Sequence, residues 1–141
     1  MDSRDARTKE ILERSKAIAI VGLSPDEQKP SNIVARYLKN AGYKIIPVNP
    51  QHEKILGEKS YGSLSMIPER VDIVDIFMRS DKVVPIVKEA VKIKPGVVWL
   101  QLGIVNEEAK KIASDSGITF YMDVCIKQEH ERLFSGAPGA I

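Results

Sequence analysis

A ten-residue segment, residues 22–31, carries the clearest chemical potential in this sequence. It joins an apolar run to a segment of helical periodicity, so a helix would begin at its end. Gly22 lets a phosphate group approach the main chain, Ser24 supplies a hydroxyl, and Lys29 supplies a cation. Backbone amides that open the helix near Ser31 add a positive dipole. The pattern predicts a phosphate site; alternatively, Gly22 only makes a tight turn, Ser31 only caps a helix and Lys29 is only solvated.

This turn differs from the glycine-rich fingerprint of dinucleotide-binding proteins. The later glycines of G-x-G-x-x-G are missing after Gly22, and the next apolar run ends in Val48, Asn49 and Pro50. That run therefore lacks the acidic side chain that hydrogen-bonds the ribose hydroxyls in NAD enzymes. The amide of Asn49 can donate and accept at a ribose or adenine edge, and Pro50 fixes the exit of the strand. Either this pair contacts an anionic nucleotide other than NAD, or it only starts a turn.

Polar groups also follow the third and fourth apolar runs. Arg79 and Ser80 combine a guanidinium, a hydroxyl and the start of another helix, which suits a second phosphate group. The alternative is a surface arginine paired with Asp81. Gln101 closes a buried run beside Gly103 and is expected to project into the same crevice. A polar side chain in that position needs a partner, which is either a ligand or the backbone.

The single cysteine, Cys125, follows the last apolar run and precedes Lys127 and His130. A zinc site is not expected, because the chain offers only this cysteine, His52 and His130 at no zinc-binding spacing. Three interpretations of the thiol stay open. It is an ordinary core residue, a member of a Cys/His catalytic pair, or a redox-active thiol whose thiolate is favoured by Lys127.

Five apolar runs rich in β-branched residues are predicted to be strands. Because the runs lack clean polar alternation, they suit a parallel sheet that is covered on both faces. Asp75, a charged residue inside the third run, is either an edge-facing group or a hydrogen-bonded buried carboxylate. The runs are residues 17–21, 45–48, 71–77, 97–102 and 118–122.

Segments of helical period separate these runs. We expect helix starts at Ser31 or Asn32, at Ser80 or Asp81, and at Asn106, and helix stops at Gly42 and Gly117. Further helices are predicted at residues 5–15 and 127–134, a short helical turn at residues 63–67, and a loose tail at the C-terminus.

The alternation of strands and helices predicts an α/β, doubly wound, three-layer fold with a mainly parallel five-stranded sheet. The simplest strand order is 3-2-1-4-5, in which the order reverses between the first and fourth strands. Ligands of such folds bind at this reversal, beyond the carboxyl ends of the strands. The turns at residues 22–31 and 101–103 are therefore expected on opposite lips of one crevice.

Composition limits the classes of function. The 141 residues fit one domain, residues 1–141, with a core at about 16–130. The 21 basic and 19 acidic residues leave a net charge of only +2, so neither nucleic acid nor a membrane surface is an expected partner. A lone cysteine, a polar N-terminus and the absence of a long apolar run predict a cytoplasmic protein.

Taken together, several of these motifs resemble, in the same order, the small stand-alone coenzyme A-binding proteins. Their Rossmann-like domain is similar to the CoA-binding domain of the succinyl-CoA synthetase alpha subunit. The resemblance extends from about Lys16 to His130. The motifs are Gly22-Leu23-Ser24, Val48-Asn49-Pro50, Phe77-Met78-Arg79-Ser80, Val98-Trp99-Leu100-Gln101-Leu102-Gly103 and Asp123-Val124-Cys125-Ile126-Lys127-Gln128-Glu129-His130.

The resemblance implies a Rossmann-like fold with coenzyme A across the crevice. By position, Gly22, Ser24 and Lys29 would contact the CoA phosphates. Asn49 and Pro50 would form the wall near the adenosine, and Arg79 with Ser80 would make a second anionic contact. Gln101 and Gly103 would border the pantetheine arm.

The resemblance leaves two classes of function in competition. The first is a non-catalytic module that binds CoA or an acyl-CoA as a sensor or carrier, in which Cys125 forms a mixed disulfide with CoA. The second is an enzyme, either part of an acyl-CoA ligase completed by another chain or an NAD-dependent oxidoreductase. The synthetase uses a phosphorylated histidine on a second domain, for which these 141 residues leave no room.

Overall fold

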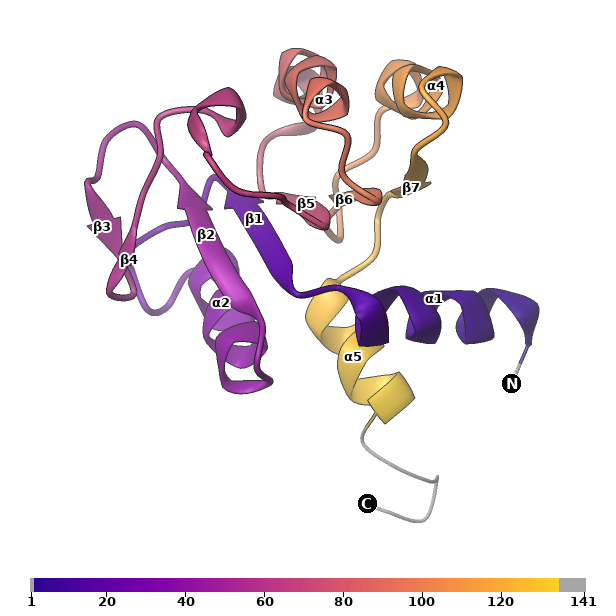
Figure 1. The fold of residues 1–141 in the computed structure, drawn as a ribbon, viewed down its shortest axis with the longest axis horizontal. Helices are drawn as coiled ribbons and strands as arrows, with labels where there is room; N and C mark the ends of the chain where they lie inside the picture. The colour runs from indigo at the N-terminus through magenta and orange to yellow at the C-terminus, as the bar shows by residue number, and fades with distance from the viewer. Residues whose placement is uncertain (1, 135–141) are drawn as a thin grey trace.

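A computed structural model describes residues 2–134 and shows a three-layer α/β fold (Figure 1). The central sheet is all parallel, and its strands lie in the order β2-β1-β5-β6-β7. This confirms the predicted Rossmann-like, doubly wound class. The strands are β1 (Ala17–Val21), β2 (Lys44–Val48), β5 (Ile73–Ile76), β6 (Val97–Leu100) and β7 (Thr119–Tyr121).

The predicted strand order is wrong. The third predicted strand, β5, pairs with β1 rather than with β2, so the order reverses between β1 and β5. The chain achieves this by crossing from β2 over β1 through residues 49–72. Both orders satisfy the handedness rule for parallel connections, and apolar periodicity does not choose between them. The crevice therefore lies one strand away from its predicted place, between the turn after β1 and the turn after β5.

Helices cover the two faces of the sheet unequally (Figure 1). On one face, α1 (Ser3–Arg14), α2 (Pro30–Asn40) and α5 (Ile126–Phe134) share a core with Ile18, Ile20 and Trp99. On the other face, α3 (Val83–Lys92) and α4 (Glu107–Asp115) pack on Ala19 and Val21. Successive residues of β1 point to opposite cores, which explains why this strand is buried along its whole length.

Several helix ends differ from the predicted ones. Asn106 caps α4 as predicted, because its side chain accepts a hydrogen bond from the Ala109 amide. The predicted starts at Ser31 or Asn32 and at Ser80 or Asp81 are wrong: Lys29 precedes α2, and a short 3-10 helix η2 (Ser80–Lys82) precedes α3. Gly42 and Gly117 follow their helices with positive φ, as predicted for helix stops. The predicted loose tail lies outside the described residues.

The long connection after β2 contains structure that the sequence did not reveal. Strands β3 (Lys54–Ile55) and β4 (Glu58–Lys59) form a small antiparallel hairpin, whose turn residues Leu56 and Gly57 both have positive φ. The predicted helical turn at residues 63–67 is present as the 3-10 helix η1 (Leu64–Met66). Its Leu64 is fully buried in the core beneath α3, so this connection is fixed to the sheet.

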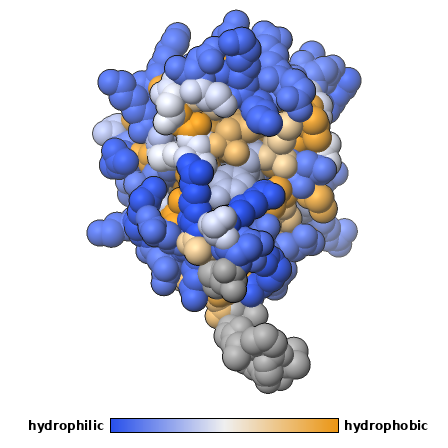
Figure 2. All heavy atoms as spheres, turned by 90° about the vertical axis from the view of Figure 1, so that its right-hand side faces the viewer, coloured by the Kyte–Doolittle hydropathy of each residue, from blue (hydrophilic) through white to orange (hydrophobic). Residues whose placement is uncertain are grey.

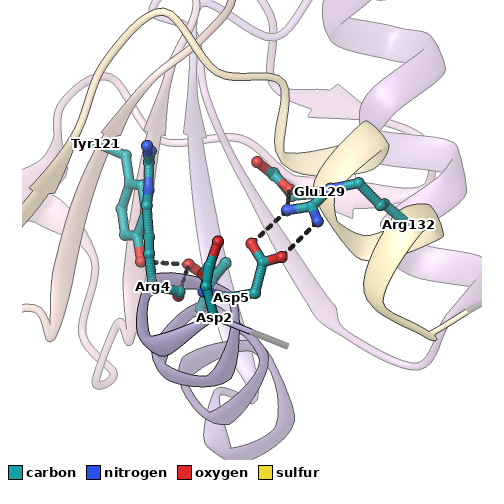
Figure 3. Close-up of polar contacts among 7 residues, drawn as sticks. Asp2, Arg4, Asp5, Tyr121, Glu129 and Arg132 are labelled. Carbon is teal, nitrogen blue, oxygen red and sulfur yellow. Dashed lines mark hydrogen bonds and ion pairs between the residues drawn. The ribbon is translucent and has the colours of Figure 1, made fainter.

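The N-terminal helix is tied to α5 and β7 by polar contacts (Figure 3). Arg132 donates two hydrogen bonds to the Asp5 carboxylate, at 2.8 and 2.7 Å, and also pairs with Glu129. The Thr8 hydroxyl lies 2.7 Å from the hydroxyl of Tyr121. These contacts fix α5, whose first turn borders the functional site described below.

Strand β7 forms one edge of the sheet, on the side of the molecule shown in Figure 2. Hydrophobic side chains gather at the centre of this face and hydrophilic ones surround them. Phe120 and the neighbouring Ile118 and Met122 are only partly buried. None of the helices between residues 2 and 134 is long and apolar enough to cross a membrane.

Candidate functional site

The turn after β1 touches the turn after β5, and glycine is required at the contact. Gly22 has φ +83°, and a Cβ atom at this position would lie 2.2 Å from the Phe77 carbonyl oxygen. The Gly22 amide donates to the Val48 carbonyl at 3.0 Å, so the same residue also joins the end of β2. Gly22 therefore lets three strand ends converge at the point where the strand order reverses.

Hydrogen bonds within the turn fix its shape. The Ser31 hydroxyl accepts from the Ser24 amide at 3.0 Å, and the Ser24 hydroxyl accepts from the Asp26 amide at 3.0 Å. The Asn32 side chain donates to the Ser24 carbonyl at 2.8 Å. Ser31 thus holds the turn closed instead of capping the helix. Helix α2 begins with Pro30, which has no amide hydrogen, and the Asn32 amide donates to the Lys29 carbonyl at 3.0 Å.

A cleft of about 570 Å³ opens on one side of this turn. Most of its lining is apolar, but it also contains the cations Arg79 and Lys127 and the thiol of Cys125. Its walls come from the start of α2, the turns after β5 and β6, and the start of α5. The lining residues are Pro30, Ile33, Val34, Phe77, Met78, Arg79, Gln101, Leu102, Ile104, Cys125, Lys127 and Gln128.

A second cleft, of about 390 Å³, adjoins the first at Met78, which lines both. It lies between the ends of β1 and β2 on one side and η1 with α3 on the other. Its one charged lining residue among those described is Glu89. The lining residues are Val21, Gly22, Val48, Asn49, Pro50, Gln51, Gly62, Ser63, Leu64, Met78, Ile86 and Glu89. We call these clefts the thiol cleft and the β2 cleft.

Three of the predicted site residues, Gly22, Asn49 and Pro50, line the β2 cleft. The Asn49 side chain is also structural, because its amide nitrogen donates to the Leu23 carbonyl at 3.0 Å and its oxygen accepts from the Gln51 amide at 2.9 Å. Asn49 thereby fixes the exit of β2 against the turn after β1.

Arg79 and Gln101 line the thiol cleft, each with a contact to the protein. The Arg79 guanidinium is largely exposed and lies 3.2 Å from the Asp81 carboxylate. Gln101 is 4% exposed, and its side-chain oxygen accepts a hydrogen bond from the Ile126 amide at 3.1 Å. Gln101 therefore has the backbone partner that the sequence left open, and this bond fixes the start of α5.

Four predicted contact residues, Ser24, Lys29, Ser80 and Gly103, line neither cleft. Lys29 is exposed just before α2. The Ser80 hydroxyl accepts from the Val105 amide at 3.1 Å, which connects η2 to the segment before α4. The Gly103 amide donates to the Asp123 carboxylate at 2.7 Å.

Cys125 is partly buried at the floor of the thiol cleft, packed against the core of the α2 and α5 face. The Lys127 ammonium lies 3.1 Å from Glu131 and over the ring of Tyr37. His130 shares a 2.7 Å hydrogen bond with the Tyr37 hydroxyl and stacks on Phe134. Burial lowers the pKa of His130 by disfavouring the imidazolium. His130 is thus engaged with Tyr37 of α2, and it does not line the thiol cleft.

Asp75 lies in the middle of β5, fully buried, and neither carboxyl oxygen has a hydrogen-bond partner. It fits neither of the two environments expected from the sequence. Burial raises the pKa of Asp75 well above its usual value, because an ion at this position would lose its hydration without compensation. In the described part of the chain, no group of three or more His, Cys, Asp or Glu residues is arranged to hold a metal ion.

Sequence reasoning missed several residues that line the two clefts. Phe77 and Met78 directly follow β5, and their apolar character made them look like the end of a buried strand. Leu64 and Glu89 come from the crossover and from α3, and only tertiary structure brings them to the β2 cleft. The correct strand order would have pointed to Phe77 and Met78, since it places the end of β5 at the crevice.

Comparison with known proteins identifies the relatives of this fold. A family model described as CoA binding domain matches residues 16–131. The chain is 44% identical over 125 residues to the uncharacterized protein YneT of Bacillus subtilis (strain 168), covering 89% of this chain and 93% of YneT. It also resembles the solved structure of a hypothetical protein from Pyrococcus horikoshii OT3, with a TM-score of 0.89 and 41% identity over 92% of this chain and 91% of that chain.

Larger enzymes contain a similar unit. The chain is 39% identical over 70 residues to acetate–CoA ligase (ADP-forming) I of Archaeoglobus fulgidus, a match that spans 50% of this chain but 10% of the ligase. The dinucleotide-forming acetyl-coenzyme A synthetase 1 of Ca. Korarchaeum cryptofilum, in its apo form, matches with a TM-score of 0.67 and 28% identity, over 74% of this chain and 25% of that chain. These matches confirm the resemblance drawn from the sequence.

Proposed function

The chain belongs to the CoA-binding domain family, and from this premise we propose that it binds coenzyme A or an acyl-CoA as a non-catalytic sensor or carrier module. The observation that carries the proposal is the pair of clefts that meet at Met78, beside the turn after β1. An elongated ligand with an anionic middle and two dissimilar ends fits two adjoining clefts of different character. Coenzyme A is such a ligand, with adenosine at one end and a thiol at the other.

The phosphates would lie between the clefts. There they would approach the turn after β1, which contains Gly22 and Ser24, and the start of α2. Arg79, with Ser80 behind it, would supply a second anionic contact, since its guanidinium is largely exposed at the rim of the thiol cleft. The charge of Lys29 would act at longer range, because this residue lies outside both clefts.

The adenosine would occupy the β2 cleft, against Asn49 and Pro50. The pantetheine arm would run through the thiol cleft past Gln101, with Gly103 holding the neighbouring turn in place, and end near Cys125. A mostly apolar cleft with few polar groups is the usual environment of such an arm.

A binding role is favoured over catalysis by the composition of the thiol cleft. Its described lining offers one thiol and two cations but no paired acid and base. The alternative, a ligase subunit completed by another chain, has one specific observation in its favour: the A. fulgidus ligase carries a similar segment as a tenth of its length. Copurification with a nucleotide-binding partner chain would favour that alternative.

The binding proposal is tested by calorimetric titration of the same purified protein with CoA and with NAD. Binding of CoA with a dissociation constant below one millimolar, corresponding to more than ~4 kcal/mol, is the expected result. NAD should bind more weakly, because the end of β2 presents Asn49 instead of a carboxylate. A preference for NAD would favour the oxidoreductase, and no heat with either ligand would refute the proposal.

We also expect Cys125 to form a mixed disulfide with CoA. Its thiolate would attack CoA disulfide, forming one Cys125–CoA disulfide and releasing one CoA thiolate, so the exchange needs no further oxidant. Intact mass after treatment with CoA disulfide should rise by one CoA and return to the starting value with reductant. Cys125→Ser is the control. An unchanged mass in the wild-type protein would leave Cys125 as a core residue.

A further inference from the structure

The outer wall of the β2 cleft is formed by Gly62, Ser63 and Leu64, which lie in a segment of the crossover at residues 60–65. The first part of this segment runs along β2 like an additional strand. The Tyr61 amide donates to the Pro47 carbonyl at 3.0 Å, and the Asn49 amide donates to the Tyr61 carbonyl at 2.9 Å. The Ser60 hydroxyl donates to the Asn49 carbonyl at 3.0 Å. Backbone pairing with β2 therefore fixes this half of the segment.

The second half of the segment is held by one side chain from α3. One carboxylate oxygen of Glu89 accepts from the Leu64 amide at 3.1 Å, and the other accepts from the Ser65 hydroxyl at 3.1 Å. Leu64 is fully buried beneath them. Because both Leu64 and Glu89 line the β2 cleft, these two hydrogen bonds set the position of its outer wall relative to α3.

The two clefts also differ in charge. The thiol cleft contains Arg79 and Lys127, whereas the described lining of the β2 cleft contains no lysine or arginine and has Glu89 as its one charged group. Both oxygens of that carboxylate are already engaged with residues 64 and 65. The β2 cleft thus suits an uncharged ring system held by shape more than a phosphate group.

We propose that Glu89 is a positioning residue for the adenosine end of the ligand, acting through the wall at residues 63–65. This inference rests on the proposed binding of CoA and adds a residue that determines how the nucleoside end is recognised. Without the carboxylate, the Leu64 amide and the Ser65 hydroxyl lose their charged acceptor, and the wall is free to move away from α3. Among the described lining residues, Met78 alone is shared by the thiol cleft and the β2 cleft.

The test compares three ligands on Glu89→Met, which keeps the length of the side chain but removes both acceptors. The ligands are CoA, adenosine 3′,5′-bisphosphate for the nucleoside end, and 4′-phosphopantetheine for the other end. Dissociation constants from NMR titration should rise about tenfold for CoA and for the bisphosphate, as expected for the loss of one charged hydrogen bond. The constant for 4′-phosphopantetheine should stay within about twofold.

Two further variants separate positioning from general damage. Glu89→Gln keeps one acceptor for the Leu64 amide, so it should bind CoA with an affinity between those of Glu89→Met and the wild type. Glu108→Gln, on the exposed start of α4, is the matched control and should bind all three ligands like the wild type. Amide exchange without ligand reads the contact directly, and the Leu64 amide should exchange faster in Glu89→Met.

The outcomes distinguish the two proposals. A wild-type protein that binds none of the three ligands would refute the proposed function itself. A wild-type protein that binds CoA, while Glu89→Met weakens both fragments equally or neither, would leave that function intact and overturn the role of Glu89. Selective loss of the bisphosphate together with faster exchange at Leu64 supports it.

Discussion

Asp75 provides a quantitative test of the packing of this sheet. It lies between Ile20 of β1 and Trp99 of β6, fully buried, and neither carboxyl oxygen has a hydrogen-bond partner. Burying an unpaired polar group costs about 1–3 kcal/mol in proteins. Asp75→Leu replaces the two oxygens with methyl groups on the same branching pattern. At pH 5 we expect the free energy of unfolding of this variant to exceed that of the wild type by about 1–3 kcal/mol. Strain from the larger methyl groups would reduce this gain.

The stability difference should grow as the pH rises. The pKa of Asp75 is raised in the folded protein and is about 3.9 in the unfolded chain. Between these two values the folded protein holds one more proton than the unfolded chain, so its free energy of unfolding falls as the pH rises, by about 1.4 kcal/mol per unit. The difference between Asp75→Leu and the wild type should therefore widen by up to about 3 kcal/mol between pH 5 and pH 7.

Urea unfolding at pH 5, 6 and 7 measures this difference, with the fluorescence of Trp99, the one tryptophan, as the probe. Asp75→Asn removes the titrating group while keeping its shape and should show the same pH dependence as Asp75→Leu. Asp115→Asn, on the exposed end of α4, is the control and should follow the wild type. A stability difference that stays constant from pH 5 to pH 7 would refute the argument, because it would mean that Asp75 ionises normally in the folded protein.

Two further predictions concern the turn after β1 and the contact between α2 and α5. Gly22→Ala should lower the free energy of unfolding by at least about 2 kcal/mol and weaken CoA binding, because the new methyl group meets the Phe77 carbonyl at a positive φ. Urea unfolding and calorimetry measure the two effects. Wild-type values in both would show that Gly22 does not approach Phe77 this closely. The lowered pKa of His130 means that the neutral form stabilises the fold above about pH 6.5 and that this contribution is lost as the pH falls. His130→Phe should therefore lose less stability than the wild type between pH 7 and pH 5, and equal losses would show that His130 titrates normally.

Much of the architecture follows from local patterns in the sequence. The fully buried strands β1, β5 and β6 were predictable because, apart from Asp75, their residues are apolar on both faces, as a sheet between two helix layers requires. Gly22 was predictable as a turn residue because a tight turn between a strand and a helix needs a positive φ. Asn106 was predictable as a cap because its side chain suits the first turn of a helix.

Other features depend on tertiary contacts that local patterns do not encode. The sequence does not specify whether the crossover after β2 returns beside β2 or passes over β1, and this choice moved the crevice to the end of β5. The sequence left open whether a ligand or the backbone is the partner of Gln101, and only the arrival of α5 supplies an amide for its side chain. Ser31 looked like a helix cap, but the helix begins one residue earlier at Pro30 and frees its hydroxyl for the turn.

We propose that a CoA molecule lies across the two clefts that meet at Met78. Titration of ¹⁵N-labelled protein with CoA, followed by two-dimensional NMR, tests it most directly. We expect saturable shifts in the amides of the non-proline residues within 22–31, 49–51, 77–79 and 125–128. No shifts are expected at Arg7 and Thr119, which contact each other outside both clefts. Shifts confined to other surfaces, or no shifts at millimolar CoA, would contradict it.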